Sequence, residues 1–220
     1  MRHSLQDMKP MILSVLIALG LMLQCGRAEA GQRESIILAG GCFWCVEANF
    51  ESVPGVVSAV SGFTGGNVKN PSYEDVKTGK TGHYEAVKVT FDSARISRDE
   101  ILDLYFHSSD PTDAGGQFCD RGAPWRTAVF VSDKAQRQAA EAAKARAMTA
   151  LGRKIVTPIR TAGAFYPAEE LHQGYYRGSK RLITRWGIKT QAEAYKRYRK
   201  ACGRDAKVKK LWGRSAAFAG

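Results

Sequence analysis

Hydrophobic and polar positions along the chain switch between the period of a strand and the period of a helix. Residues 34–39 (ESIILA) form a short β-rich run that ends at two glycines, which predicts a strand followed by a tight turn. In Cys42–Val53, apolar side chains recur at spacings of three and four, which predicts an amphipathic helix. Residues 84–91 (YEAVKVTF) alternate strictly, and this pattern places Glu85 on an otherwise apolar face.

The same patterns continue to the end of the chain. Further strands are predicted at residues 56–63, 125–131 and 154–161, and further helices at 97–107, at 134–151 and from Pro167 onward. Ser97 and Glu100 have the spacing of a capping box, which favours a helix start there. From Lys180 onward the chain is polar and helical. This order predicts an α+β protein, a two-layer α/β sandwich around a mixed β-sheet, built as a single domain with a C-terminal helical tail.

The first thirty residues are typical of a secretory signal peptide. Residues 11–23 carry no charge, and Ala28-Glu29-Ala30 places small residues at the spacing that a signal peptidase needs. The alternative is a membrane anchor, but this apolar run is shorter than the roughly 20 residues that span a bilayer. We therefore expect cleavage of residues 1–30, export to the periplasm and no stable membrane anchor. The remainder divides into a domain at 31–179 and a basic tail at 180–220.

Composition and charge narrow the function classes. Hydrophobic residues make up 44% and charged residues 25%, which excludes a disordered or disulfide-dense chain. The net charge is +12, and most of the surplus lies in the tail. A secreted basic module that binds anionic surfaces is one hypothesis, and it predicts salt-sensitive binding. The tail shows no clear aromatic pattern for base stacking, so no nucleic-acid partner is expected. No His/Cys cluster has metal-ligand spacing, so no metal site is expected.

The segment Gly40–Cys45 (GGCFWC) is the leading candidate for chemistry. It predicts a strand, a glycine turn and a helix that begins at Cys42. Because a helix N-terminus presents free N–H groups and a partial positive charge, we expect a depressed pKa and a nucleophilic thiolate at Cys42. Cys45 lies one helical turn further on, where it can resolve an oxidised Cys42 through a local disulfide.

Two other cysteines complete the set that remains after signal cleavage. Cys202 lies in the tail and is the second candidate for the resolving thiol, whereas Cys119 is expected to be a passive buried thiol. The sequence does not choose among the three possible pairings of four cysteines. A general thiol–disulfide oxidoreductase that uses Cys42 and Cys45 is the alternative enzyme, but it leaves the other motifs of the chain unexplained.

Several separated motifs share the order and spacing of one family. They are Gly41-Cys42-Phe43-Trp44, Pro54-Gly55-Val56, Gly62-Phe63-Thr64-Gly65-Gly66, Asn70-Pro71-Ser72-Tyr73, Gly82-His83-Tyr84-Glu85-Ala86-Val87, Asp110-Pro111-Thr112 and Asp120-Arg121-Gly122. Over about residues 36–176 the chain resembles the A-type peptide-methionine (S)-S-oxide reductases. In the tail, Cys202-Gly203-Arg204-Asp205 and Leu211-Trp212-Gly213 resemble a subgroup of that family.

The resemblance implies a catalytic role for four residues. Cys42 would attack the sulfoxide sulfur and Glu85 would give a proton to the sulfoxide oxygen. Tyr73 would hydrogen-bond that oxygen, and Asp120 would orient the site. Since Glu85 must be protonated to act as an acid, its apolar strand face should raise its pKa.

The resemblance also implies an apolar pocket for the substrate methyl group, formed by Phe43 and Trp44. Trp125 stands where the family usually has a second tyrosine, and Pro124 before it is also a departure. An indole offers an N–H donor but no hydroxyl, so the role of the second tyrosine stays open, with Tyr73 as the remaining candidate.

The implied reaction converts methionine (S)-sulfoxide, free or in proteins, into methionine and leaves a sulfenic acid on Cys42. A second thiol then forms a disulfide, which a thioredoxin-like dithiol reduces. The resemblance implies no prosthetic cofactor. We expect a monomer that repairs oxidised exported proteins.

Overall fold

The computed structural model describes residues 32–220, and Arg33–Gly220 form one compact unit. The expected signal peptide lies outside the described residues. Within residues 32–220, no helix is both long enough and apolar enough to cross a bilayer.

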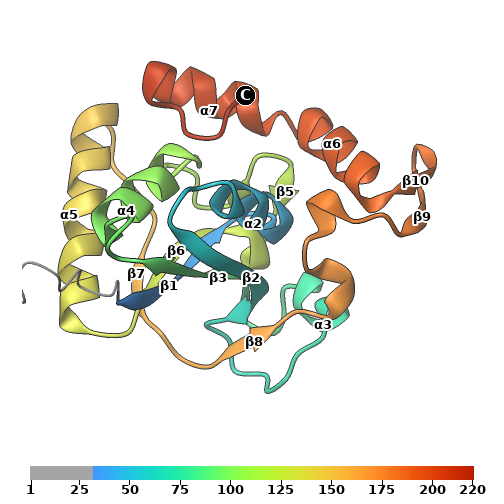
Figure 1. Ribbon diagram of the computed structural model, residues 1–220, viewed down its shortest axis with the longest axis horizontal. Helices are drawn as coiled ribbons and strands as arrows, with labels where there is room; N and C mark the ends of the chain where they lie inside the picture. Colours follow the sequence, from blue (N-terminus) through green and yellow to red (C-terminus); the bar gives the residue numbers. More distant parts are fainter. Residues whose placement is uncertain (1–31) are drawn as a thin grey trace, which may run out of the picture. The chain divides into compact units, whose positions relative to one another are not determined.

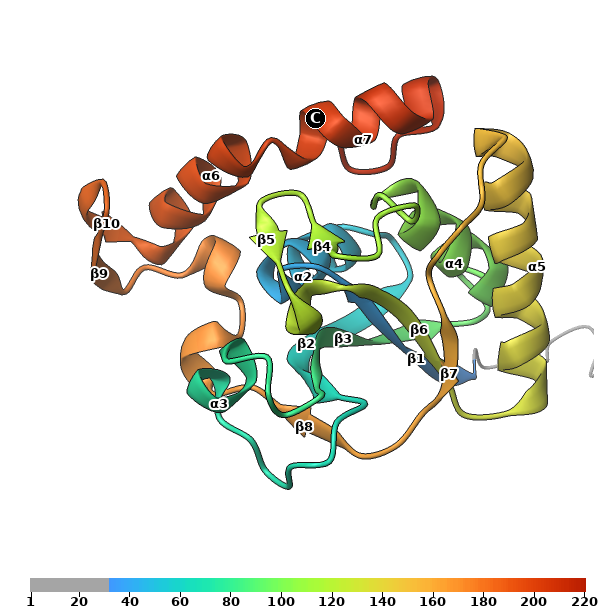
Figure 2. The same cartoon turned by 180° about the vertical axis from the view of Figure 1, so that it is seen from behind.

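A six-stranded sheet with the order β7-β6-β1-β3-β2-β8 forms the centre of the unit (Figures 1 and 2). Its strands are β1 (Arg33–Gly40), β2 (Val56–Thr64), β3 (Tyr84–Asp92), β6 (Thr127–Val131), β7 (Ile159–Thr161) and β8 (Phe165–Pro167). The pairing of β6 with β7 is parallel, whereas the other neighbouring strands pair antiparallel. The predicted α+β class with a mixed sheet is confirmed.

The helices bury one face of this sheet. In β1, the alternation sends Ile36 and Leu38 into the larger core and Ile37 into a smaller one on the opposite face. The larger core receives most of its helical side chains from α2 (Phe43–Glu51), α4 (Arg98–His107) and α5 (Lys134–Leu151), and two further helices of the chain also contribute to it. Fully buried side chains such as Phe50 contribute about 1.5–3 kcal/mol each to folding. Glu85 lies on this helix-covered face, as the alternation of β3 predicts.

Local end signals set the helix boundaries. The Ser97–Glu100 capping box is present at the start of α4, and Gly152 ends α5 in the left-handed conformation with φ 60°. A second capping box, from Ser72 to Asp75, starts the short helix α3 (Tyr73–Lys77). These signals are short-range hydrogen bonds, so the sequence alone places them well.

The region after residue 153 differs from the sequence prediction. The strand expected at 154–161 shrinks to β7, and the helix expected from Pro167 is wrong, because Pro167 ends strand β8. There it lies opposite Gly62 of β2 at the edge of the sheet, where a residue without an N–H is tolerated. Two short 3₁₀ turns follow, at Glu170–His172 and Tyr175–Arg177.

The tail begins with a hairpin that the sequence pattern did not predict. Its strands are β9 (Arg181–Thr184) and β10 (Gly187–Thr190), and helices α6 (Gln191–Cys202) and α7 (Arg204–Trp212) follow. Both ribbon views show α6 and α7 passing over the region of α2 and the short strands β4 (Gly116–Gln117) and β5 (Asp120–Arg121). The Trp212 side chain of α7 is buried and donates a 2.9 Å hydrogen bond to the Ser109 carbonyl.

Candidate active site

Cys42 is the N-cap residue of α2 and follows directly on β1 and its glycine turn. Gly41 has φ 84°, and a Cβ on it would lie 2.6 Å from the Gln117 Cβ, so the turn requires glycine here. The Cys42 side chain is buried beneath this turn, with 6% of the residue exposed. The predicted strand–turn–helix placement of Cys42 is confirmed.

The predicted protonation of Cys42 is wrong. Burial raises the pKa of the Cys42 thiol well above its usual value, and Cys45, Glu85 and Asp120 raise it further. The hydrogen bond from Cys42 lowers the pKa of Cys45 to about 6 against the opposing effect of burial, and the Arg204 charge also lowers it. The negative charge of the pair therefore resides on Cys45, and Cys42 keeps its proton.

Glu85 reaches the first turn of α2 from strand β3 and is 2% exposed. Its Oε2 accepts a 3.0 Å hydrogen bond from the Phe43 N–H, and its Oε1 accepts a 2.8 Å bond from Trp125 Nε1–H. Burial raises the pKa of Glu85 to about 8, although both hydrogen bonds act in the opposite direction. Glu85 therefore holds a proton at neutral pH.

A cavity of about 70 Å³ collects the residues singled out in the sequence. Its lining consists of Cys42, Phe43, Trp44, Tyr73, Glu85, Asp120, Trp125 and Tyr198. Two larger surface hollows, of about 430 and 570 Å³, contain none of these eight residues. The small cavity is the candidate site because the buried Cys42 thiol and the buried Glu85 carboxyl meet in it.

Aromatic rings form the apolar wall of the cavity. The Phe43 ring centroid lies 6.0 Å from that of Tyr73, and both rings approach His172. Trp44 stacks on Tyr175 with 3.8 Å between centroids and 7° between planes. These contacts hold the wall in place before any substrate binds.

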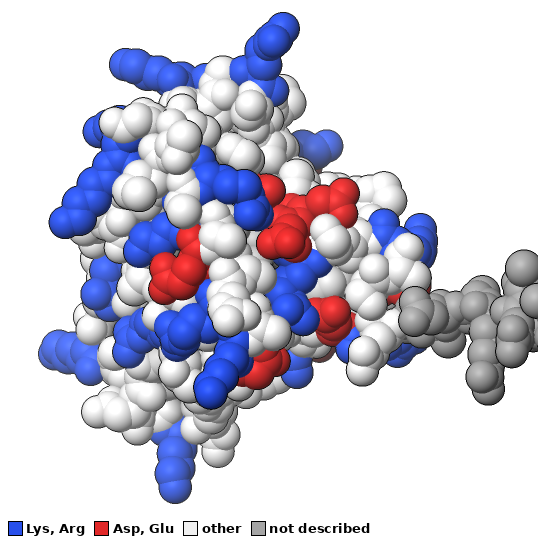
Figure 3. All heavy atoms as spheres, turned by 90° about the vertical axis from the view of Figure 1, so that its left-hand side faces the viewer, with Lys and Arg blue, Asp and Glu red and all other residues white. Residues whose placement is uncertain are grey.

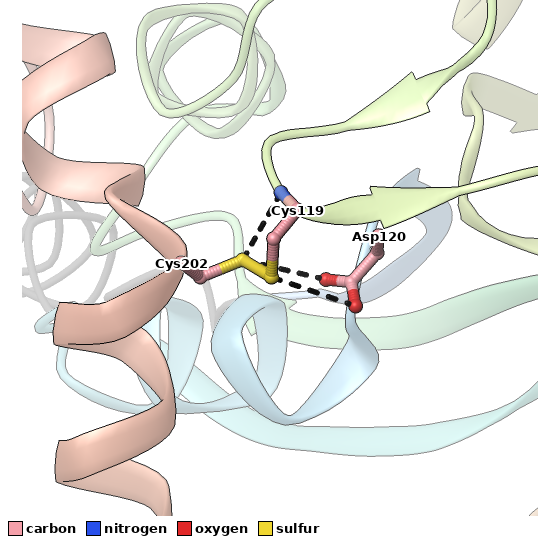
Figure 4. Close-up of side chains that lie close together, drawn as sticks. All are labelled: Cys119, Asp120 and Cys202. Carbon is pink, nitrogen blue, oxygen red and sulfur yellow. Dashed lines mark hydrogen bonds between the residues drawn. A yellow bond between two sulfur atoms is a disulfide. The ribbon is translucent and has the colours of Figure 1, made fainter.

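The structure pairs Cys202 with Cys119 in a disulfide (Figure 4). Cys119 is exposed, so the expectation of a passive buried thiol is wrong, because the tail brings Cys202 to it across 83 residues of sequence. Cys42 and Cys45 are free. The Asp120 carboxylate and the two disulfide sulfurs lie within 4.8 Å of one another, but sulfurs joined in a disulfide are not thiolate ligands for a metal.

Sequence reasoning missed two site residues that come from the tail. Tyr198 lines the cavity and its hydroxyl donates a hydrogen bond to Asp120. Arg204 is buried, lowers the pKa of Cys45 through its charge, and donates to the Gly40 carbonyl at 3.2 Å and to the Ser108 carbonyl at 3.0 Å. The sequence motif around Cys202 indicated that the tail takes part in the site. Spacing along the chain, however, does not show which residues of a tail fold back onto a site.

Comparison with known proteins agrees with this geometry. The family described as peptide methionine sulfoxide reductase matches residues 34–212. Peptide methionine sulfoxide reductase MsrA 2 of Rhizobium meliloti is 45% identical over 193 residues, which cover 88% of this chain and 90% of that protein. The MsrA protein of Bacillus licheniformis is 42% identical over 191 residues, which cover 84% and 97% of the two chains.

Solved structures agree as well. Mxr1 of Saccharomyces cerevisiae in its reduced form has a TM-score of 0.63 and 30% identity, with 66% of this chain and 84% of that chain covered. Methionine sulfoxide reductase A of Corynebacterium diphtheriae has a TM-score of 0.60 and 30% identity, with coverage of 74% and 85%. The chain therefore belongs to the peptide methionine sulfoxide reductase family, and the predicted enzyme class, a peptide-methionine (S)-S-oxide reductase, is confirmed.

Proposed function

We propose that this enzyme reduces the S epimer of methionine sulfoxide, free or in exported proteins, with Cys42 as nucleophile and Glu85 as proton donor. The observation that carries the proposal is one cavity in which Cys42, a protonated Glu85 and an aromatic wall meet. A sulfoxide sulfur carries a polar oxygen and an apolar methyl group, so its reduction needs all three.

The protonation states support a balanced first step. As the Cys42 sulfur attacks the sulfoxide sulfur, its proton passes along the existing hydrogen bond to the Cys45 thiolate. Glu85 gives its proton to the sulfoxide oxygen, and this oxygen ends on Cys42. One thiol and one sulfoxide thus become one sulfenic acid and one thioether, and the total charge of the three side chains is unchanged.

The second step removes the sulfenic acid. The Cys45 thiol attacks the Cys42 sulfur, forms the Cys42–Cys45 disulfide and releases water. Cys45 is favoured as the first resolving thiol because Cys202 is already bonded to Cys119. Cys202 is the alternative once that bond is reduced. An external thioredoxin-like dithiol then restores both thiols, and no prosthetic cofactor takes part.

The proposal also includes the cellular compartment in which the enzyme acts. Residues 11–30 support export to the periplasm, where the enzyme would act as a monomer without a membrane anchor and repair oxidised proteins. N-terminal sequencing of the protein recovered from the periplasm tests this point. A chain that begins at Gly31 is expected, and a chain that keeps residues 11–23 would contradict cleavage.

A racemic methionine sulfoxide peptide tests the reaction. The methyl group, the oxygen and the lone pair of the sulfoxide must each occupy a different position around Cys42. The pocket therefore distinguishes the two epimers. The wild-type enzyme with a thioredoxin-like reductant should consume half of the racemate and stop. Equal consumption of both epimers would contradict the proposed specificity.

A general thiol–disulfide oxidoreductase is the second candidate, since Cys45 has a pKa of about 6 one helical turn from Cys42. It predicts rapid exchange with unrelated protein disulfides and no sulfoxide turnover. The basic-surface hypothesis predicts salt-sensitive binding to anionic surfaces. On the face shown in Figure 3, Lys and Arg are spread out, with Asp and Glu between them, and do not merge into one patch.

A further inference from the structure

Tyr198 lies in the tail but lines the cavity that holds Cys42 and Glu85. We propose that Tyr198 is a catalytic residue whose hydroxyl donates a hydrogen bond to the sulfoxide oxygen, together with Tyr73. This inference deepens the proposed function and rests on it. The tail would then be a working part of the active site rather than only a carrier of Cys202.

The position of Tyr198 is held from two sides. Its hydroxyl donates to Asp120 Oδ2, and its ring meets the edge of Trp44 with 6.2 Å between centroids. Cys202 follows one turn later on α6 and is bonded to Cys119, the residue directly before Asp120. The disulfide therefore fixes α6 where Tyr198 enters the cavity.

The donors around the cavity show why a second hydroxyl matters. The Trp125 indole N–H is directed at Glu85 Oε1, so it is already engaged. Glu85 has a single proton to give. A sulfoxide oxygen that gains negative charge during attack is stabilised by several aligned donors, and the tyrosines that line the cavity are Tyr73 and Tyr198.

The Tyr198 hydroxyl keeps its proton in this environment. Burial raises the pKa of Tyr198, and the negative charges that Cys42 and Asp120 can carry raise it further. A phenol O–H turns about its C–O bond. The Tyr198 O–H can therefore turn from the Asp120 carboxylate toward a substrate oxygen in the same cavity, while the ring stays in place.

Tyr198→Phe removes the hydroxyl and keeps the ring. We expect the rate of methionine formation in a single turnover at saturating sulfoxide peptide to fall about 10- to 100-fold, the effect of losing one hydrogen bond to a charged oxygen. Tyr176→Phe is the matched control. Tyr176 is also half-buried and also donates to a carboxylate, that of Glu51, but it lies outside the cavity, and its variant should stay within twofold of wild type.

Mass spectrometry of the Cys119–Cys202 disulfide in both variants separates chemistry from helix placement. A slow Tyr198→Phe enzyme that keeps this disulfide supports the proposal. A rate within twofold of wild type, an equal fall in Tyr176→Phe, or a fall that accompanies loss of the disulfide would each overturn it. Wild-type turnover beside an inactive Cys42→Ser variant, measured in the same series, tests the proposed function independently of Tyr198.

Discussion

At the scale of single residues, burial decides which groups of the active site carry protons. It raises the pKa of Glu85 to about 8 and keeps the proton on Cys42, while Cys45 has a pKa of about 6. Between these two values the thiolate of the cysteine pair and the carboxylic acid coexist. Such a separation of pKa values is how a site obtains a base and an acid at one pH.

Cys42→Ser should lose essentially all sulfoxide reduction, because a serine hydroxyl in this buried position is not an effective nucleophile toward sulfur. The measurement is methionine release per enzyme in a single turnover. The variant should keep the wild-type unfolding midpoint, since the change is nearly isosteric. A wild-type rate in this variant would refute the assignment of the nucleophile.

Glu85→Gln should slow the sulfoxide step about 10²–10⁴-fold, because an amide cannot deliver a carboxylic proton. Gln keeps the shape and can still accept from the Phe43 N–H, so the fold should survive. Rapid-quench measurement of methionine formation checks this. A rate within threefold of wild type would show that the proton comes from elsewhere.

The pH profile of kcat/KM should be bell-shaped. The rate should rise through about pH 6, as the cysteine pair loses its first proton, and fall through about pH 8, as Glu85 loses the proton that it must donate. In Glu85→Gln the upper limb should disappear while the lower limb stays. A profile that keeps its fall near pH 8 in that variant would contradict the assignment to Glu85.

At the scale of elements, two helices bring the thiols together in different ways. Helix α2 places Cys45 next to Cys42 by its own geometry, so that pair exists wherever α2 forms. Helix α6 places Cys202 against Cys119 through tertiary packing. The local pair has no docking step, which favours Cys45 as the first resolving thiol.

Cys45→Ser and Cys202→Ser separate the two routes. After one turnover without reductant, Cys202→Ser should still form the Cys42–Cys45 disulfide, whereas Cys45→Ser should form an internal disulfide with Cys42 slowly or not at all. Peptide mapping by mass spectrometry identifies the bonds. If Cys45→Ser makes a Cys42–Cys202 bond at the wild-type rate, the tail is the primary partner.

At the scale of the whole molecule, the Cys119–Cys202 disulfide ties the tail to the rest of the compact unit 33–220. It closes a loop across 83 residues of sequence and so restricts the unfolded chain. Buried contacts of the tail, including those of Arg204 and Trp212, also raise the free energy of unfolding, because they stabilise the folded state.

Cys119→Ser should therefore lower the free energy of unfolding by about 2–4 kcal/mol. Urea unfolding followed by tryptophan fluorescence measures the change. Wild-type protein in which this disulfide has been reduced serves as the control and should show a similar loss. An unchanged unfolding midpoint would mean that the packing of the tail alone holds it in place.

Short-range patterns determined much of this protein from the sequence. The alternation of β3 placed Glu85 on the buried face, the capping box at Ser97 set the start of α4, and the separated motifs indicated the family. Each of these depends on residues close in sequence or on motif order. Helix periodicity likewise placed Cys45 one turn from Cys42.

Tertiary structure alone decided which residues from distant segments meet. The Cys119–Cys202 bond, the entry of Tyr198 into the cavity and the approach of Arg204 to the Gly40 carbonyl all depend on how the tail folds back. The proton on Cys42 depends on packing too, because burial raises the pKa of this thiol, and Cys45 as well as Glu85 and Asp120 from other elements raise it further. Long-range burial is not encoded in the spacing of any one segment, which is why the sequence predicted the wrong direction for that pKa.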